Sequence, residues 1–364
     1  MSEISQVEDK IKSNEPLTFD DGLFLMRDDV SLHRIGMLAD SVRWRFNGIV
    51  TYYNVNTHLN PTNLCISRCP LCAFRAEADS ERAKTMTFDE VKERANEAAA
   101  NGSTEIHIVG GLHPEKNYDW YRDIITTVRN AAPKLHIKAW AAPEIDHFTT
   151  LTSWSIKQVL RDMIAAGLNS MPGGGAEIFA DKPRQIIAPR KINAARWLEI
   201  HRAAHKVGLS TNATMLFGHV ETKSDRIDHL IRLRELQTES LSQRDNTKSA
   251  AFNAFVPLVY QPHATLRLQR AAASDILRTI AVSRVMLNNI PHIKAYWVTL
   301  GLQIAQIAQA YGADDMDGTI NGEKVHREAG TQSPDAIEVE NIKRLIKETG
   351  HEPTERDSEY SCIG

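Results

Sequence analysis

The sequence lacks several features that would place the protein in a specialised class. Its 43 Lys and Arg residues are balanced by 46 Asp and Glu residues, and no basic stripe stands out, so a nucleic-acid-binding surface is not expected. It contains no run of about 18 apolar residues, so no membrane-spanning helix is expected. Residues 1–12 are polar and lack the apolar centre of a signal peptide. We therefore expect a cytoplasmic protein.

Cysteine is scarce, with four residues in a chain of 364. A disulfide framework needs pairs of cysteines spread over a small secreted domain, and this chain has no such arrangement. Three of the four, Cys65, Cys69 and Cys72, instead follow one another in a C-x3-C-x2-C pattern. Closely spaced thiols in a reducing compartment typically bind metal or carry out redox chemistry. Cys362 stands alone near the end of the sequence, and we expect an ordinary thiol there.

Three thiolates in this spacing are compatible with two kinds of metal site. They are one short of a 4Fe–4S cluster held by four cysteines, and a cluster held by three leaves one iron open to a substrate or cofactor. They are also too few for a four-cysteine zinc site. The alternative is a zinc ion held by the three cysteines and one histidine, for example His58 or His113.

After residue 48 the hydrophobic pattern alternates between strands and helices. Runs rich in Val, Ile, Thr and aromatic residues predict strands, and helical segments with capping signals such as Thr87-Phe-Asp-Glu90 separate them. This alternation predicts a parallel α/β sheet covered by helices, and eight units over ~250 residues close into a (β/α)8 barrel. The expected strands are 49–59, 105–109, 135–141, 168–171, 209–217, 252–259, 293–300 and 315–320.

The chain is expected to divide into three segments. Residues 1–48 are predicted to form a polar, helical N-terminal extension, residues 49–330 the barrel, and residues 331–364 a C-terminal helix and tail. The stretch 238–250 is almost entirely polar and is predicted to be an exposed loop.

The cysteine pattern, with Leu71 before the last cysteine, resembles that of the radical S-adenosylmethionine (SAM) enzymes. The resemblance implies that Cys65, Cys69 and Cys72 hold a 4Fe–4S cluster and that SAM binds its open iron as a co-substrate. It also implies reduction by an electron donor such as flavodoxin or ferredoxin, which releases a 5′-deoxyadenosyl radical. Enzymes of this family have full or partial barrels, in agreement with the predicted strands.

Barrel enzymes carry their chemistry on the loops at the C-terminal ends of the strands, and several candidate residues fall there. Gly110 and Gly111 follow the second expected strand, and their backbone groups are candidates to hold the methionine end of SAM. A triple glycine at 173–175 follows the fourth strand. Glu144 and Glu177 are candidate hydrogen-bond acceptors for a ribose, with surface ion pairs as the alternative for both.

Longer strings narrow the resemblance. They look like the cluster loop and strand-end motifs of the radical enzymes of menaquinone synthesis and of the deazaflavin-forming synthases. Three of them, and Asn212 in particular, favour the aminofutalosine synthase family over the dehypoxanthine futalosine cyclases. The strings that carry the resemblance are 59–74, 108–114, 137–147, 171–179, 200–205, 210–219, 312–319 and 355–357.

This resemblance implies a transferase reaction. The adenosyl radical would add to the enol-ether double bond of 3-[(1-carboxyvinyl)oxy]benzoate. The adduct would rearrange and lose a carboxylate to give 6-amino-6-deoxyfutalosine, an intermediate of menaquinone biosynthesis. The alternatives within the superfamily are the cyclases, which release 5′-deoxyadenosine, and the deazaflavin-precursor synthases. A zinc-stabilised scaffold without catalysis is the alternative from a different class.

The implied substrate carries two carboxylates and needs cationic groups or N–H donors nearby. Asn212, His219 and Arg184 are our candidate catalytic residues, and Arg190 and Lys191 belong to the same basic group as Arg184. A solvated helix start is the alternative for that group. Four histidines near strand ends are candidates to orient a carboxylate or move a proton, namely His113, His147, His219 and His263.

Overall fold

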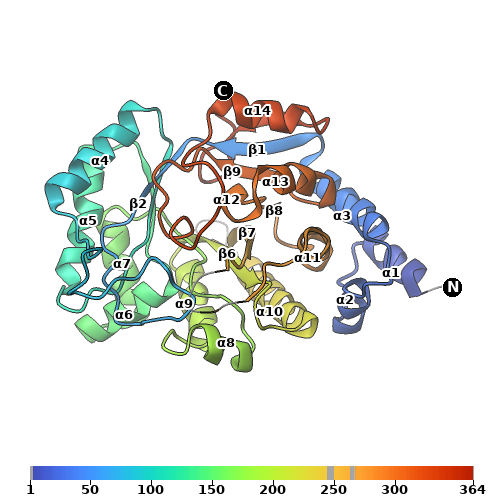
Figure 1. Cartoon of the computed structure of the whole chain (residues 1–364), viewed down its shortest axis with the longest axis horizontal. Coiled ribbons are helices and arrows are strands. Elements are labelled where there is room, and N and C mark those ends of the chain that lie inside the picture. Colours follow the sequence, from blue (N-terminus) through green and yellow to red (C-terminus); the bar gives the residue numbers. More distant parts are fainter. Residues whose placement is uncertain (1–2, 244–249, 263–265, 267, 364) are drawn as a thin grey trace.

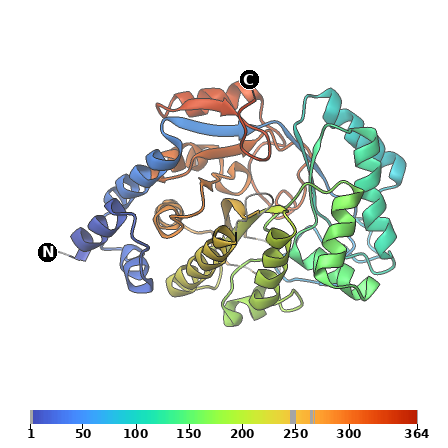
Figure 2. The same cartoon turned by 180° about the vertical axis from the view of Figure 1, so that it is seen from behind.

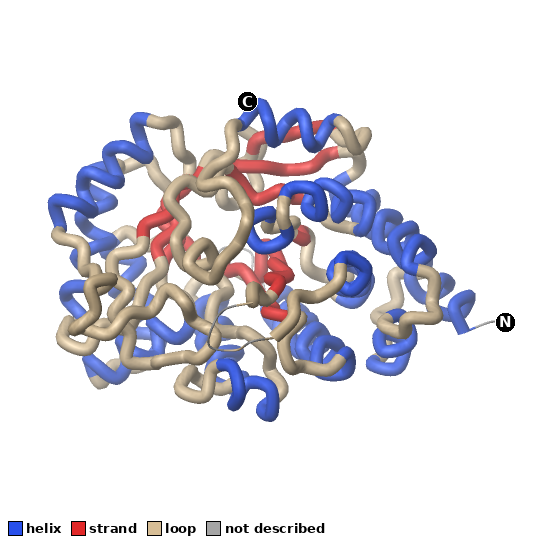
Figure 3. The backbone as a smooth tube through the Cα atoms, in the orientation of Figure 1, coloured by secondary structure: helices blue, strands red, loops and turns tan. Residues whose placement is uncertain are grey.

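A seven-stranded parallel sheet forms the centre of the protein in a computed structural model that describes residues 3–243, 250–262, 266 and 268–363. The strand order, β2-β3-β4-β5-β6-β7-β8, is the order along the chain, and helices cover the outside of the curled sheet (Figures 1 and 3). The strands are β2 (Asn56–Leu59), β3 (Glu105–Ile108), β4 (His136–Ala139), β5 (Ser170–Met171), β6 (Ser210–Phe217), β7 (Phe252–Val259) and β8 (His292–Ile293).

An eighth parallel strand, β9 (Asp315–Gly318), lies between the two edges of this sheet. It meets the β8 edge through the bridge between Lys294 and Asp315, and the segment after it meets β2 through the bridge between Thr57 and Asn321. The predicted α/β barrel is therefore confirmed. Seven strands pair continuously, and single bridges on either side of β9 complete the ring.

The first expected strand, 49–59, divides in two at Val55. The Val55 carbonyl accepts a hydrogen bond from the Thr104 N–H at 2.8 Å, so the chain is tied to β3 only from this point on. Before it, β1 (Val50–Asn54) belongs to a second parallel sheet of order β10-β1-β9, with β10 (Glu352–Glu355) at its outer edge.

The strand expected at 293–300 is wrong beyond its first residue. β8 ends at Ile293, and Trp297–Leu300 form the short helix α12. The β-branched and aromatic residues of this run favour a strand, but tertiary contacts override that preference. The Trp297 indole Nε1 donates to the Gly318 carbonyl at 2.9 Å, which turns the chain toward β9.

Capping signals in the sequence start several of the helices. The Thr87 hydroxyl accepts the Glu90 N–H at the start of α4, and the Glu90 carboxylate accepts the Thr87 N–H at 2.7 Å. Helix α6 was not expected; it starts at an Ala-Pro step, where the missing proline N–H costs little. The helices are α1 (Glu3–Lys12), α2 (Phe19–Leu25), α3 (Leu32–Asn47), α4 (Phe88–Ala100), α5 (Tyr118–Ala131), α6 (Ala142–Thr152), α7 (Ile156–Ala166), α8 (Asp181–Ile187), α9 (Ala194–Lys206), α10 (Lys223–Ser242), α11 (Ala273–Met286), α12 (Trp297–Leu300), α13 (Leu302–Ala308) and α14 (Val339–Lys347).

The N-terminal helices α1, α2 and α3 lie on the flank of the barrel beside α10 and α11 (Figures 1 and 2). The buried Arg278 guanidinium of α11 donates to the carbonyls of Leu25 and Val30, both at 3.0 Å. The division into an extension at 1–48, a barrel and a tail stays a prediction. Among the described residues, no helix is both long and apolar enough to cross a membrane.

The C-terminal tail folds back onto the barrel and contacts β9 and β3. Arg356 Nε pairs with the Asp315 carboxylate of β9 at 2.8 Å, and the Ser358 hydroxyl donates to the Glu105 carboxylate of β3 at 2.6 Å. The exposed loop expected at 238–250 begins later than predicted, because α10 continues to Ser242. Residues 244–249 of that loop, and His263, lie outside the described residues.

Candidate active site

A cavity of about 290 Å³ lies inside the barrel. Its size is near the lower end of the range of small-molecule sites, ~300–1,000 Å³. A second hollow of about 820 Å³ adjoins it at His58, Asn63 and Phe74, and no cysteine lines that second hollow. Most of the residues expected at the site line the first cavity, namely Cys65, Cys69, Cys72, Gly110, Gly111, Glu144, Glu177 and Asn212.

The cysteines lie on a long loop between β2 and α4 that backbone contacts fix in place. Asn63 is buried and holds the loop together, because its side chain donates to the Arg82 carbonyl at 2.7 Å and accepts the Lys84 N–H at 2.8 Å. The Gly111 N–H donates to the Thr62 carbonyl at 2.8 Å. Gly111 can lie this close because it has no side chain: a Cβ there would overlap the Leu64 carbonyl oxygen.

Two of the three thiols, those of Cys69 and Cys72, share one electrostatic environment. Burial raises the pKa of Cys69 to about 11, and burial also raises the pKa of Cys72. The ammonium group of Lys191 opposes both rises and is the strongest influence that favours the thiolates. Lys191 is thus a cation held beside the sulfur atoms that would carry a metal cluster, whereas Cys362 is exposed and apart from them.

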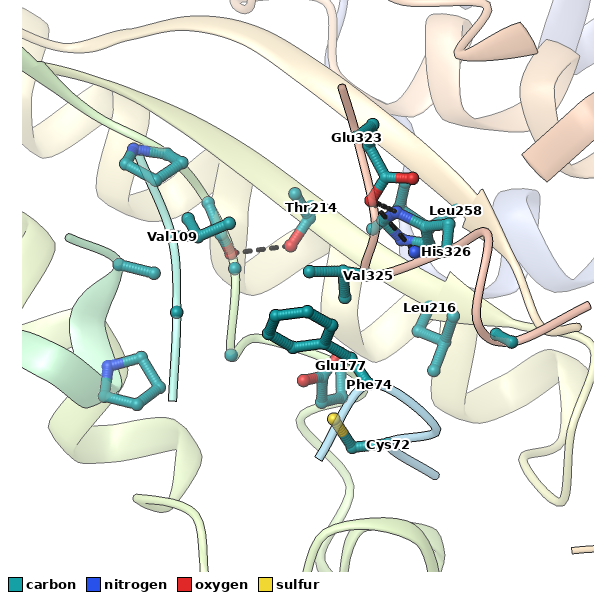
Figure 4. A pocket seen from close by; sticks show the side chains of 18 of the residues that line it. Cys72, Phe74, Val109, Glu177, Thr214, Leu216, Leu258, Glu323, Val325 and His326 are labelled. Carbon is teal, nitrogen blue, oxygen red and sulfur yellow. Dashed lines mark hydrogen bonds and ion pairs between the residues drawn. The ribbon is translucent and has the colours of Figure 1, made fainter. Parts of the chain in front are cut away.

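Lys191 also forms an ion pair with the buried carboxylate of Glu177, inside the cavity. Burial raises the pKa of Glu177, but Lys191, together with Arg184 and His219, outweighs burial and leaves that pKa below its ordinary value. Glu177 has a φ of +46°, which is uncommon for a residue with a side chain and costs backbone strain. Glu177, Cys72 and Phe74 line the same cavity and are labelled in Figure 4. The predicted contact between Glu177 and a ribose stays a prediction.

Glu144 lies in the first turn of α6 and lines the same cavity. Burial raises its pKa to about 7, although N–H groups that include that of Gly110 lower it in part. The Glu144 carboxyl group therefore gains or loses its proton near neutral pH. It also accepts a hydrogen bond from the backbone N–H of Gly110, the glycine that follows β3. A ribose or another hydrogen-bonding ligand remains our expectation for it.

The protonation of Glu144 predicts a pH-dependent stability. Between pH 4.5 and about 7 the folded protein keeps a proton that the unfolded chain has lost, so stability falls as pH rises through this window. At ~1.36 kcal/mol per pKa unit, the loss amounts to roughly 3 kcal/mol. Between pH 5 and pH 8 the free energy of unfolding, measured in urea, should fall by roughly 3 kcal/mol more in the wild type than in Glu144→Gln. An equal pH dependence in both proteins would contradict it.

The triple glycine at 173–175 lets the loop after β5 pack against its neighbours. A Cβ on Gly173 would lie 2.6 Å from the Asn212 carbonyl oxygen, and one on Gly175 would overlap the Pro143 ring. Gly175 also has a φ of +84°, which favours glycine. The Thr214 hydroxyl donates to the Gly173 carbonyl at 2.6 Å, as Figure 4 shows. The loop is therefore part of the cavity wall.

Two of the three candidate catalytic residues do not line the cavity. The Arg184 guanidinium is buried and donates to backbone carbonyls, including those of Ala176 at 2.5 Å and Gly175 at 2.9 Å. His219 turns its Nε2 to the Leu216 carbonyl and its Nδ1 to the Val220 N–H. Asn212 does line the cavity. Three of the four histidines expected near strand ends lie among the described residues, and none of these three, His113, His147 and His219, lines the cavity. The exposed Arg190 does not line it either.

Comparison with known proteins gives the family. Residues 59–233 match the model of the radical SAM superfamily, and residues 249–363 match the CofH/MqnC C-terminal region. Aminodeoxyfutalosine synthases of Streptomyces coelicolor and Thermus thermophilus are each 38% identical to this chain, over 98% and 97% of its length and 93% and 94% of theirs. The chain belongs to the aminodeoxyfutalosine synthase family of radical SAM enzymes.

Related activities lie at somewhat lower identity. A 5-amino-6-(D-ribitylamino)uracil–L-tyrosine 4-hydroxyphenyl transferase of Methanopyrus kandleri is 36% identical, over 91% of this chain and 89% of that protein. The cyclic dehypoxanthine futalosine synthase of S. coelicolor is 33% identical, over 100% and 89%. In fold, the chain is similar to methylornithine synthase, with a TM-score of 0.72 at 15% identity over 95% and 97% of the two chains.

The cysteine loop fits the 4Fe–4S cluster that radical SAM enzymes carry. Among the described residues, no three His, Cys, Asp or Glu side chains are arranged to share one metal ion. A 4Fe–4S cluster does not need three protein ligands on one metal ion, because each of its thiolates binds a different iron atom. Three thiols that line one cavity beside a buried cation are a suitable donor set for such a cluster.

The position of Arg184 predicts a structural effect in this aminodeoxyfutalosine synthase family member. Arg184→Met removes the hydrogen bonds that hold the loop at 175–178, and we expect the free energy of unfolding to fall by about 3 kcal/mol. Chemical denaturation measures this loss. The matched control is Arg190→Met, an exposed neighbour that should change stability by less than ~0.5 kcal/mol. Equal effects of the two substitutions would contradict the prediction.

Sequence reasoning missed the charged residues inside the barrel. Lys138 of β4 pairs with Glu105 of β3 at 2.5 Å, and Lys294 after β8 pairs with Asp317 of β9 at 3.0 Å. All four line the cavity and are buried. The sequence did contain a signal for them, because each is a charged residue within a predicted central strand. An unpaired charge is rarely buried, so such residues indicate buried ion pairs or a ligand site.

Proposed function

We propose that this chain is an aminodeoxyfutalosine synthase that acts on 3-[(1-carboxyvinyl)oxy]benzoate and SAM. The reaction would form 6-amino-6-deoxyfutalosine, with rearrangement of the substrate and loss of one carboxylate as carbon dioxide or bicarbonate. The observation that carries the proposal is the 38% identity to two such synthases over nearly the whole chain, together with a cavity lined by all three cysteines.

The residues of the site would have two roles, as ligands of the cluster and as hydrogen-bond acceptors for SAM. Cys65, Cys69 and Cys72 would hold the cluster, which supplies the reducing electron that splits SAM into methionine and a 5′-deoxyadenosyl radical. Glu144 and Glu177 lie in the same cavity, where carboxylates can accept hydrogen bonds from the hydroxyl and amino groups of SAM.

The wall of the cavity supports radical chemistry because it is largely apolar on one side. Phe74, Leu216, Leu258 and Val325 all line the cavity and are labelled in Figure 4. Apolar side chains exclude water, which protects a reactive intermediate from side reactions. The proposal includes a cytoplasmic location, where thiols stay reduced, and a flavodoxin or ferredoxin as electron donor.

An anaerobic assay tests the proposal directly. The protein with reconstituted cluster is incubated with a reductant, SAM and 3-[(1-carboxyvinyl)oxy]benzoate, and the products are read by mass spectrometry. A product that retains the adenosyl group and has lost one carboxyl group supports the synthase. Free 5′-deoxyadenosine without such a product would overturn the substrate assignment and favour a reaction like that of the sibling families.

A further inference from the structure

Buried polar residues meet at one end of the cavity, which we call its floor: Lys138 of β4, Lys294 after β8, Asn212 of β6 and His107 of β3. Lys138 and Lys294 are only 4% and 3% exposed, and the ammonium group of each has a single hydrogen-bond partner among the described residues. An ammonium group has three N–H donors, so two on each lysine are left for a ligand. Asn212 of β6 is 9% exposed, lines the same cavity, and its side-chain amide has no partner in the described part of the chain.

The acidic partners of these lysines are held by other groups. The Glu105 carboxylate also accepts from the Ser358 hydroxyl of the tail at 2.6 Å. Asp317 has a φ of +61°, a strained conformation of the kind that clusters at functional sites. The two acids and two lysines balance in charge. Burial lowers the pKa of Lys138, and the Glu105 carboxylate opposes that fall.

A histidine adds a further polar group to the floor. His107 of β3 pairs with Lys138 of β4 in the sheet register, and both line the cavity. Burial, with His58 and Lys138 nearby, holds the pKa of His107 well below its usual range, so its ring is neutral. The buried Nε2 of His107 has no partner among the described residues. The floor therefore offers several hydrogen-bonding groups that the protein itself does not use.

The floor lies far from the cysteine end of the cavity. Asn212 precedes Leu216 by four residues on β6, which at ~3.3 Å per residue places it roughly 13 Å closer to the start of the strand. The Leu216 N–H donates to the Glu177 carbonyl at 2.7 Å. The Glu177 carboxylate in turn pairs with Lys191, the cation that acts on two thiols of the cysteine loop. The cavity therefore has three regions in order: the cysteine loop at one end, an apolar wall in the middle, and the polar floor at the other end. A ligand with an aromatic ring and a carboxylate at its far end fits this order, with the ring against the apolar wall and the carboxylate at the floor.

We propose that Lys138 and Lys294, with Asn212, bind the carboxylate on the aromatic ring of the substrate. This inference rests on the proposed function. The vinyl carbon that gains the adenosyl group must face the cysteine end, so the ring carboxylate points to the floor. The other carboxylate is the one that leaves. An ammonium pair stabilises a carboxylate as an anion, so it suits the carboxylate that the product retains.

The test compares two ligands that differ only in the ring carboxylate. Isothermal titration of the full chain with reconstituted cluster, without SAM, measures binding of 3-[(1-carboxyvinyl)oxy]benzoate and of 2-phenoxyprop-2-enoate. The wild type should bind the first roughly 10- to 100-fold more tightly, as expected for charge-assisted hydrogen bonds. The double variants Lys138→Met/Glu105→Gln and Lys294→Met/Asp317→Asn should each reduce this ratio several-fold. Both remove a whole pair, so no buried charge is left alone.

A surface pair of the same chemistry is the control. Lys223 and Asp28 form an exposed ion pair at 2.6 Å, and Lys223→Met/Asp28→Asn should keep the wild-type ratio. A ratio near one in the wild type, or an unchanged ratio in both floor variants, would overturn the inference. Mass spectrometry of the wild-type reaction is a separate readout: absence of the adenosylated product would refute the proposed function, whatever the binding ratio.

Discussion

Replacement of any one of Cys65, Cys69 and Cys72 by alanine is expected to abolish both the iron–sulfur cluster and product formation. The three thiols line one cavity, and a cluster that keeps only two protein ligands would not be retained. The measurements are the iron content, the absorbance near ~400 nm of reconstituted protein, and the yield of adenosylated product. We expect each variant to lose the absorbance band and to form no detectable product.

The control for this prediction is the fourth cysteine. Cys362 is exposed and does not line the cavity, so Cys362→Ser should retain the cluster and wild-type turnover. Full turnover in any one of the three alanine variants would refute the cluster assignment. Loss of the cluster in Cys362→Ser would mean that the tail reaches the site.

Gly111→Ala is expected to reduce kcat/KM by about 100-fold or more. A Cβ at this position would overlap the Leu64 carbonyl oxygen and would lie 3.1 Å from the Cys65 Cβ. Backbone cannot move aside as a side chain can, so the cysteine loop itself must shift. A displacement of ~1 Å in a catalytic site can cost about 100-fold in rate. Steady-state kinetics and iron content measure the effect.

Gly22→Ala provides a matched substitution away from the site. Gly22 lies in α2, and its added Cβ would meet only side-chain ends, the Met286 Sδ at 2.9 Å and two Ile227 carbons at 3.0 Å. These atoms can move, and alanine is a better helix former than glycine. We therefore expect unchanged kcat/KM in Gly22→Ala. Similar losses of activity in both variants would show that the Gly111 effect is not specific to the cysteine loop.

The local features of the site could be predicted from the sequence. The C-x3-C-x2-C spacing and the glycines at strand ends depend on residues close together in the chain, and the structure places Cys65, Cys69, Cys72, Gly110 and Gly111 around one cavity. The order of strands was also accessible, because alternating periodicities of two and 3.6 residues distinguish strands from helices.

Features that depend on distant segments could not be predicted in this way. Arg184 and Lys191 are both basic residues after the triple glycine, yet one binds backbone carbonyls and the other lies in the cavity beside Glu177. Arg184 lies within the short helix α8 and Lys191 follows that helix, and only the tertiary structure decides which way each side chain points. The ring of His219 is held by hydrogen bonds to Leu216 and Val220, which local spacing did not indicate, and its catalytic role stays a prediction.

The sequence by itself determined the family-specific chemistry: the three thiols, the glycine turns that let backbone approach them, and the parallel α/β order that places both at one end of a barrel. Only the tertiary structure decided the opposite end of the cavity. Lys138 of β4, Asn212 of β6 and Lys294, which follows β8, are separated by many residues along the chain. Their meeting depends on strand register and on barrel closure by β9, which are set by contacts between distant segments rather than by local spacing.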